Sequence, residues 1–196
     1  MFYSLQGEGH HVGRPAIFIR FSGCNMGLGN GGPCPFCDTD FMGTDGPLGG
    51  CYDADDLADA ALSLWPGRER PFIVCTGGEP MMQLSENLVA EMSARGCEIA
   101  VETNGSVPVA QGIDWISVSP KPWAELRQQS GHELKLLFPL EGMDPIQFEG
   151  LDFQHHYLQP IDRGALWEAT AKAIGYCLAH PKWKLSLQTH KLAGFK

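Results

Sequence analysis

The stretch FIVCTGGEP, at residues 72–80, decides the fold of this chain. Its apolar run at 72–76 predicts a short buried strand, and the two glycines that follow let a ligand approach the backbone closely. A helix is predicted at 85–95, with Leu88, Val89 and Met92 facing inward and Gly96 ending it. A second strand is predicted directly after this helix, so the order strand–helix–strand indicates a parallel βαβ unit.

The same alternation extends along the chain in both directions. Residues 103–114 are an exception. They join two predicted strands and only just reach the length of about a dozen residues that a helical crossover needs. They also contain Gly105, Pro108 and Gly112, which disfavour a helix. We therefore count about six core strands and three helices. Strands are predicted at 16–21, 72–76, 98–102, 115–119, 133–138 and 184–188, with a further candidate at 156–159, and helices are predicted at 53–65, 85–95 and 164–180.

Length and composition narrow the class of protein. The 196 residues are too few for a complete eight-stranded (β/α) barrel of about 250 residues, and no linker or repeat divides 1–196, so we expect a single domain. A net charge of −9 disfavours nucleic acid as a partner. No run of about 18 apolar residues predicts a membrane helix, and the first residues do not resemble a secretory signal.

Three of the seven cysteines share one Gly/Pro-rich loop, residues 23–50. Cys24, Cys34 and Cys37 form a C-x9-C-x2-C pattern that core packing does not explain. An odd number of cysteines without an export signal favours a reducing cytosol over disulfides. The other cysteines are expected in the core, apart from the unassigned Cys51: they are Cys75, Cys97 and Cys177.

Four interpretations of the cysteine loop remain open on the residues alone. The favoured one is an iron–sulfur cluster held by three thiolates, with one iron left open for a ligand. A thioredoxin-like redox pair and a chance set of free thiols are weaker alternatives. A structural zinc site is a further alternative, and it needs a fourth ligand, for which the candidates are His10, His11 and Cys51.

Polar motifs recur where the predicted strands end. They lie at 76–80, 102–105, 119–121 and 159–160. Because parallel α/β architectures bind ligands at the carboxyl ends of their strands, we expect one shared site.

A further group of candidates lies near the two ends of the chain. Arg20, in the strand at 16–21, either forks onto a ligand carboxylate or faces solvent. Glu8, in the stretch QGEG at 6–9, can accept hydrogen bonds from ring and amino N–H groups. His190 and Lys191 are expected in a solvated tail.

Together these motifs resemble the 7-carboxy-7-deazaguanine synthases, a family of the radical S-adenosylmethionine superfamily, over the whole chain. The Gly-Gly-Glu-Pro element alone is typical of the superfamily, and the combination is specific to the family. The motifs are QGEG at 6–9, the cysteine loop ending in CDT at 37–39, TGGEP at 76–80, ETNG at 102–105, SPK at 119–121 and QTHK at 188–191.

The resemblance implies a fold and a reaction. The fold is a partial, open TIM-like barrel of about six parallel strands with about three helices. The reaction converts 6-carboxy-5,6,7,8-tetrahydropterin to 7-carboxy-7-deazaguanine with loss of ammonia, on the route to queuosine. A [4Fe–4S] cluster cleaves S-adenosylmethionine to a radical that takes a hydrogen atom from the pterin, and S-adenosylmethionine is regenerated as a cofactor.

The resemblance also assigns residues. Cys24, Cys34 and Cys37 would hold the cluster, and Thr39 would ligate Mg²⁺. The residues implied to contact S-adenosylmethionine are Phe36, Cys37, Asp38, Gly78, Ser119, Pro120, Lys121, Gln159, Pro160, Ile161 and Asp162. The residues implied to contact the pterin are Leu5, Gln6, Gly7, Glu8, Arg20, Thr76 and, through its terminal carboxylate, Lys196.

The resemblance also implies binding partners for the protein, and two alternative functions remain open. The resemblance implies a cytoplasmic homodimer that receives electrons from a donor such as flavodoxin or ferredoxin. The C-x9-C-x2-C spacing departs from that of relatives at residues 27–33, where the insert would alter access for that donor. The alternatives are a radical S-adenosylmethionine activating enzyme with a protein partner, and a non-catalytic zinc-binding module.

Overall fold

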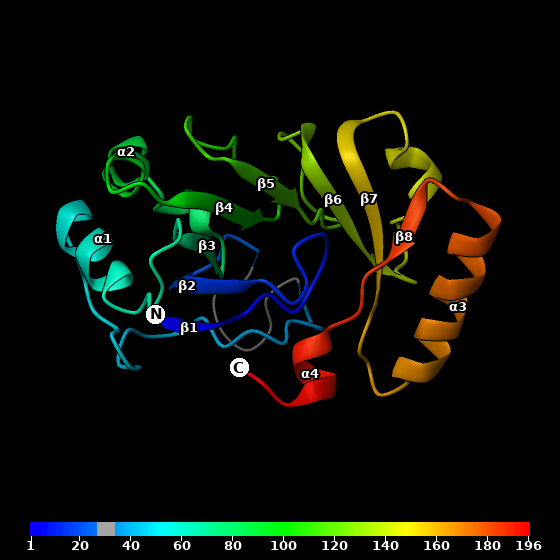
Figure 1. Cartoon of the computed structure of the whole chain (residues 1–196). Coiled ribbons are helices and arrows are strands. Elements are labelled where there is room, and N and C mark those ends of the chain that lie inside the picture. Colours follow the sequence, from blue (N-terminus) through cyan, green and yellow to red (C-terminus); the bar gives the residue numbers. More distant parts are fainter. Residues whose placement is uncertain (27–33) are drawn as a thin grey trace.

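The computed structural model describes residues 1–26 and 34–196. Within these residues eight strands form one sheet, and strands that follow one another in sequence also lie side by side (Figure 1). The strands are β1 (Phe2–Leu5), β2 (Pro15–Phe21), β3 (Phe72–Gly77), β4 (Glu98–Thr103), β5 (Trp115–Val118), β6 (Ser130–Phe138), β7 (Asp152–Pro160) and β8 (Trp183–Leu185).

The sheet is parallel from β2 to β8, and only β1 runs antiparallel to its neighbour β2. Since β1 and β8 are the two edges, the sheet curves without closing, which confirms the predicted partial, open barrel. The expected count of about six strands was too low. Short β1 was not foreseen, because its four residues FYSL form only an edge strand against β2.

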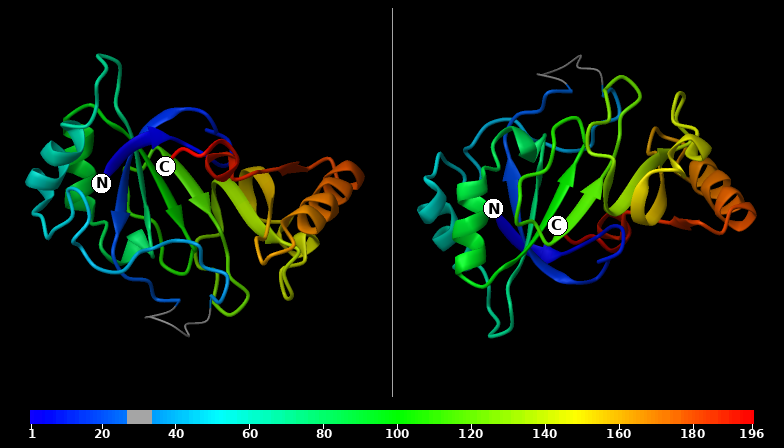
Figure 2. Two further views of the ribbon diagram at one scale, coloured as in Figure 1. Left: turned by 90° about the horizontal axis from the view of Figure 1, so that it is seen from below. Right: turned by 90° about the horizontal axis from the view of Figure 1, so that it is seen from above.

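Four α-helices occur in the described residues, one more than expected, and they leave part of the sheet uncovered. α1 (Ala54–Leu62) and α2 (Glu86–Ala94) lie together beside β2–β4, and α3 (Leu166–Ala179) covers β6–β8 on the other side (Figures 1 and 2). The fourth helix is the short α4 (Thr189–Ala193). In the described residues no helix is long and apolar enough to cross a membrane.

Helix α2 begins after Ser85, as predicted, because Ser85 caps its first turn. The Ser85 hydroxyl accepts a hydrogen bond from the Leu88 amide at 3.2 Å, which satisfies one of the free N–H groups at the start of α2. The helix ends at Ala94, and Gly96 follows with a φ of 78°, where glycine is favoured.

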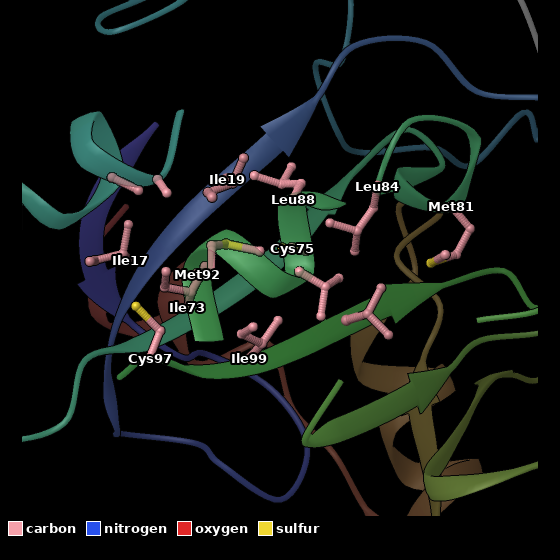
Figure 3. Close-up of a cluster of buried hydrophobic side chains, with 14 residues drawn as sticks. Ile17, Ile19, Ile73, Cys75, Met81, Leu84, Leu88, Met92, Cys97 and Ile99 are labelled. Carbon is pink, nitrogen blue, oxygen red and sulfur yellow. The ribbon is translucent and has the colours of Figure 1, made fainter. Parts of the chain in front are cut away.

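The larger hydrophobic core lies between the first half of the sheet and α1 and α2 (Figure 3). Ile17, Ile73 and Ile99 project from neighbouring strands towards Met92 of α2, and all four side chains are fully buried. A second core lies between β5–β8 and α3 and includes Val118, Leu134, Leu136, Leu158, Ala173 and Trp183. Each half of the sheet therefore has its own packed outer layer.

The loop between β1 and β2 reaches across to the far half of the sheet. The Gly9 amide donates to the Ser186 hydroxyl at 3.0 Å, and the His10 amide donates to the Glu133 carboxylate at 2.9 Å. Gly9 has a φ of 64°, where glycine is favoured, and a Cβ there would lie 2.2 Å from a Glu133 oxygen, so a larger residue would strain the backbone and displace that carboxylate. This loop therefore connects β2 to β6 and to the segment after β8.

Candidate active site

A cavity of about 580 Å³ lies at the carboxyl ends of five neighbouring parallel strands. Gly77, Thr103, Leu137 and Pro160 end or nearly end β3, β4, β6 and β7, and Ser119 follows β5. The strand-end motifs therefore meet at one cavity, as the parallel order predicts. The remaining lining residues are Glu8, Cys24, Met26, Cys34, Pro35, Phe36, Cys37, Asp38, Thr39, Phe41, Met42, Gly78, Glu102, Asn104, Ser117, Lys121, Lys135, Gln159, Ile161, Asp162 and Gln188.

The two glycines after β3 pack against the chain's own backbone. A Cβ on Gly78 would lie 1.9 Å from the Gly23 carbonyl oxygen, and one on Gly77 would lie 2.3 Å from the Phe21 carbonyl oxygen. The Gly78 amide donates to Phe21 O at 3.0 Å and the Glu79 amide donates to Gly23 O at 2.9 Å. These contacts fix the start of the cysteine loop against the end of β3.

Glu79 connects neighbouring loops through its hydrogen bonds. Its carboxylate is fully buried and accepts hydrogen bonds from the Met81 amide, the Thr103 hydroxyl and the Asn104 amide at 3.0, 2.7 and 2.8 Å. Three donors offset the cost of burying this group. The Gly-Gly-Glu-Pro motif therefore joins the cysteine loop to the end of β4, which aligns three parts of the cavity wall.

The three cysteines of the loop line this cavity, and all seven cysteines of the chain are free thiols. The Cys37 amide donates to the Cys34 carbonyl at 3.1 Å, which forms a tight turn, and the Met26 amide lies 3.4 Å from the Cys24 sulfur. In the described residues no group of three His, Cys, Asp or Glu side chains already has the spacing of metal ligands. The structure thus gathers the thiols on one wall without bringing them to ligand distance.

The surroundings of the thiols suit an iron–sulfur cluster. Burial raises the thiol pKa of Cys24 and Cys34, and the nearby Lys121 ammonium opposes this effect at both. Lys121 is held by the carbonyl and hydroxyl of Ser119 at 2.6 and 3.0 Å. Three soft thiolates from one loop, beside a fixed cation and an open cavity, match the ligands that such a cluster takes.

The residues considered as a fourth zinc ligand lie elsewhere. His10 stacks against both Trp115 and His155, at centroid distances of 4.8 and 4.5 Å, and His11 packs edge-on against Trp115. Cys51 is exposed and lines a different cavity. The described structure therefore does not complete a closed four-ligand zinc site around the thiols.

A charged pair, Glu8 and Lys135, also lines the cavity. The buried Lys135 ammonium contacts the Glu8 carboxylate, whose other oxygen accepts from Gln188 Nε2 at 2.8 Å. Burial by itself raises the pKa of Glu8, but Lys135 and Gln188 outweigh it, so the pKa is lowered and Glu8 is charged. Burial lowers the pKa of Lys135, but Glu8, Glu102 and Glu133 outweigh it, so Lys135 is charged as well.

The residues predicted to contact S-adenosylmethionine are brought together with one exception. Pro120 is buried and is not part of the cavity wall, although its neighbours Ser119 and Lys121 are. All the others line the cavity, as do the three cysteines and Thr39.

The residues predicted to contact the pterin are divided. Glu8 lines the cavity, and Gln6 and Thr76 hold the two oxygens of Glu102 on its wall, at 3.0 and 2.9 Å. Arg20 and Lys196 instead line a second cavity of about 760 Å³. Phe41 and Met42 line both cavities. Leu5 and Gly7 line neither cavity; Leu5 is at the end of β1, and the Gly7 carbonyl accepts from the Thr189 hydroxyl at 2.8 Å.

The prediction of a solvated tail at His190 and Lys191 was right for the exposure of Lys191, but both residues belong to α4 and make specific contacts. The Lys191 ammonium bonds the Asp38 carboxylate at 2.5 Å, and the His190 ring lies where a Cβ on Gly7 would be. Lys135 and Gln188 also line the cavity and were not among the predicted site residues. For Lys135 a signal exists, because the alternation in ELKLLF at 133–138 puts Glu133 and Lys135 on one face of β6.

Comparisons with known proteins agree with this site. Residues 18–184 match the model of the radical S-adenosylmethionine superfamily. The chain is 49% identical to the 7-carboxy-7-deazaguanine synthase of Bradyrhizobium diazoefficiens, over 100% of this chain and 97% of that protein. It is 50% identical to the enzyme of the same name from Caulobacter vibrioides, over 99% of this chain and 96% of that protein.

A solved structure gives the same answer for the fold. The crystal structure of QueE from Escherichia coli superposes with a TM-score of 0.72 at 28% identity, covering 97% of this chain and 92% of that one. The chain therefore belongs to the radical S-adenosylmethionine superfamily and, within it, to the family of 7-carboxy-7-deazaguanine synthases.

Proposed function

We propose that this chain converts 6-carboxy-5,6,7,8-tetrahydropterin to 7-carboxy-7-deazaguanine and ammonia, in the biosynthesis of queuosine and related 7-deazapurines. The observation that carries the proposal is the cavity at the strand ends, which is lined both by three free thiols and by a charged carboxylate that can bind N–H groups. The relatives with the matching name cover the whole chain at about half identity. Ammonia is the only group lost, so the overall conversion consumes no external oxidant.

The thiol wall would hold the cofactors. Cys24, Cys34 and Cys37 would hold a [4Fe–4S] cluster, and the cavity beside them would take S-adenosylmethionine. When bound, the cluster and S-adenosylmethionine supply the one-electron chemistry that removes a hydrogen atom from the substrate. The chain itself contributes orientation: Asp38 and Lys121, which both line the cavity, carry opposite charges suited to the amino and carboxylate groups of S-adenosylmethionine.

The part of the cavity around Glu8 and Lys135 would bind the pterin. The Glu8 carboxylate, kept charged by Lys135, accepts hydrogen bonds from the amino and ring N–H groups of the pterin. Arg20 and Lys196, from the adjoining cavity, account for its carboxylate. Phe41 and Met42, shared by both cavities, would then lie against the ring system.

A magnesium ion, a reductant and a second subunit complete the proposal. Thr39, on the cavity wall, provides an oxygen ligand for Mg²⁺ beside the substrate. Flavodoxin or ferredoxin supplies the electron in the cytoplasm, where thiols stay reduced.

For the second subunit we propose the outer face of α3. Trp167, Ile174 and Leu178 lie on one stripe of this helix and are 86%, 42% and 79% exposed. Trp167→Lys would place a charge in this interface. Sedimentation of the variant should then give a monomer where the natural chain gives a dimer; a variant that stays dimeric would remove α3 from the interface.

The ligand set is tested by Cys34→Ala. Anaerobically reconstituted variant should lose most of its iron and the brown colour of the cluster, together with cleavage of S-adenosylmethionine. Cys51→Ala is the matched control, because Cys51 is also a loop cysteine but lies outside this cavity, and it should keep full iron content. A Cys34→Ala variant with a complete cluster, or zinc without iron in the natural chain, would contradict the assignment.

A further inference from the structure

The motif QTHK at 188–191 has no role in the function proposed above, yet it makes several of the contacts around the cavity. It follows β8, the last strand, and lies against the loop between β1 and β2. The Thr189 amide and hydroxyl both donate to the Gly7 carbonyl, at 2.9 and 2.8 Å. The segment therefore bridges the opening between the two edge strands of the barrel.

Gln188 is the centre of this bridge. Its side-chain amide nitrogen donates one hydrogen bond to Glu8 at 2.8 Å and one to Asp38 at 3.0 Å. An amide nitrogen carries two hydrogens, so these two bonds use its full donor capacity. Its two acceptors come from different walls, because Glu8 belongs to the loop after β1 and Asp38 follows the cysteine pair.

Each carboxylate also has its own cation. Lys135 contacts Glu8, and Lys191 contacts Asp38 at 2.5 Å. Neither cation reaches both carboxylates among the described contacts, whereas Gln188 does. Because a neutral donor joins two anions that would otherwise repel each other, the position of one carboxylate depends on that of the other.

We propose that Gln188 is a positioning residue that couples the two halves of the cavity, so that S-adenosylmethionine on the Asp38 side and pterin on the Glu8 side each strengthen the binding of the other. The identities of the two ligands rest on the proposed function, but the link between Glu8 and Asp38 through the two hydrogen bonds of Gln188 does not. The coupling is reciprocal by thermodynamic necessity, so either ligand can be the one that is titrated.

Gln188→Met tests the donor role, because methionine keeps the length and much of the shape of glutamine but donates no hydrogen bond. In the reconstituted chain we expect S-adenosylmethionine to tighten pterin binding by about fivefold or more. In Gln188→Met this ratio should fall to about one. Titration calorimetry under anaerobic conditions, with the pterin added in the presence and absence of S-adenosylmethionine, measures both ratios.

The cluster-free chain provides a second readout. Hydrogen exchange at residues 6–9 and 37–39 should quicken severalfold in Gln188→Met, since both segments lose an anchor. Gln129→Met is the matched control: Gln129 is exposed, its amide bonds only Leu126 O at 3.1 Å, and its substitution should leave exchange at both segments unchanged.

The outcomes separate this proposal from the proposed function. Wild-type chain that binds neither ligand would refute the function, and the exchange experiment would still decide the link between Glu8 and Asp38. Wild-type chain that binds both ligands without coupling, or Gln188→Met that retains the wild-type ratio, would overturn the coupling role. Unchanged exchange in Gln188→Met would overturn the link itself.

Discussion

The contact between Gly78 and the cysteine loop gives a sharp prediction for Gly78→Ala. A Cβ at this position would lie 1.9 Å from the Gly23 carbonyl oxygen and 2.9 Å from the Cys24 Cβ. The obstructing oxygen belongs to the backbone, so no rotation of a side chain relieves the overlap. The start of the cysteine loop must move away from β3.

The expected cost follows from two terms. Overpacking against rigid neighbours costs about 1–3 kcal/mol, and displacing Gly23 also lengthens its 2.9 Å hydrogen bond from the Glu79 amide, which is worth about 1 kcal/mol. We expect Gly78→Ala to lower the free energy of unfolding by about 2–4 kcal/mol. Because Cys24 follows Gly23 directly, the same movement should lower the iron content after reconstitution.

Urea unfolding of the cluster-free chain measures the first effect, with the slope against urea checked for constancy. Iron per chain after anaerobic reconstitution measures the second. The matched control is Gly175→Ala in α3, where nothing lies within 4 Å of the new Cβ. This variant should be neutral or more stable by up to about 1 kcal/mol, with iron content unchanged.

Two results would refute the reasoning. Gly78→Ala with natural stability and full iron content would show that the loop does not depend on this contact. An equal loss of stability in Gly78→Ala and Gly175→Ala would show that the loss has no connection with the Gly23 carbonyl.

Three further predictions concern ionisable side chains that are wholly or partly buried. Glu79→Gln turns an amide donor towards groups that themselves donate, so the free energy of unfolding should fall by about 2 kcal/mol in urea titrations; an unchanged midpoint would contradict the role of these hydrogen bonds. Lys135→Met leaves Glu8 buried without its cation and should cost about 3–5 kcal/mol, of which Glu8→Gln in the same chain restores a part; no restoration would contradict the pairing. Burial and the nearby Arg14 lower the pKa of His11 from 6.5 to about 4, so the unfolded chain binds more protons between these values and stability falls as pH drops from 6.5 to 4. Because the ring is only partly buried, we expect a loss of about 1–2 kcal/mol, and urea titrations of His11→Phe should show a flatter pH dependence; an equally steep one would exclude His11 as its cause.

Most of the fold could be predicted because its strands carry strong local signals. The runs at 16–19 and 72–75 are continuous, apolar and buried, since both faces of these parallel strands are covered. The short elements carry no such signal. β1 is four residues long and α4 five, and both are stabilised by contacts distant in sequence, such as that between Thr189 and Gly7.

The site could be predicted as far as strand order decides it. Motifs that end parallel strands meet at one edge, so the positions of 76–80 and 119–121 at one cavity followed from topology. The position of Arg20 did not follow. It is paired in register with Thr76 on the next strand, and it lines the second cavity together with residues 40–52, a loop whose position strand order does not decide.

Gln188 shows a different limit. Nothing in QTHK at 188–191 indicates that one amide joins two carboxylates from residues 8 and 38. Such a contact depends on how the last segment crosses the open edge of the barrel, which only the assembled structure gives.

The central claim is that this cavity carries out the ring contraction, and product formation tests it most directly. Reconstituted chain is incubated anaerobically with S-adenosylmethionine, a reductant, Mg²⁺ and 6-carboxy-5,6,7,8-tetrahydropterin, and the mixture is analysed by mass spectrometry. The account predicts a product lighter than the pterin by one ammonia, with 7-carboxy-7-deazaguanine accumulating well beyond the amount of S-adenosylmethionine consumed. Chain that holds a full cluster and cleaves S-adenosylmethionine but leaves the pterin unchanged would contradict it.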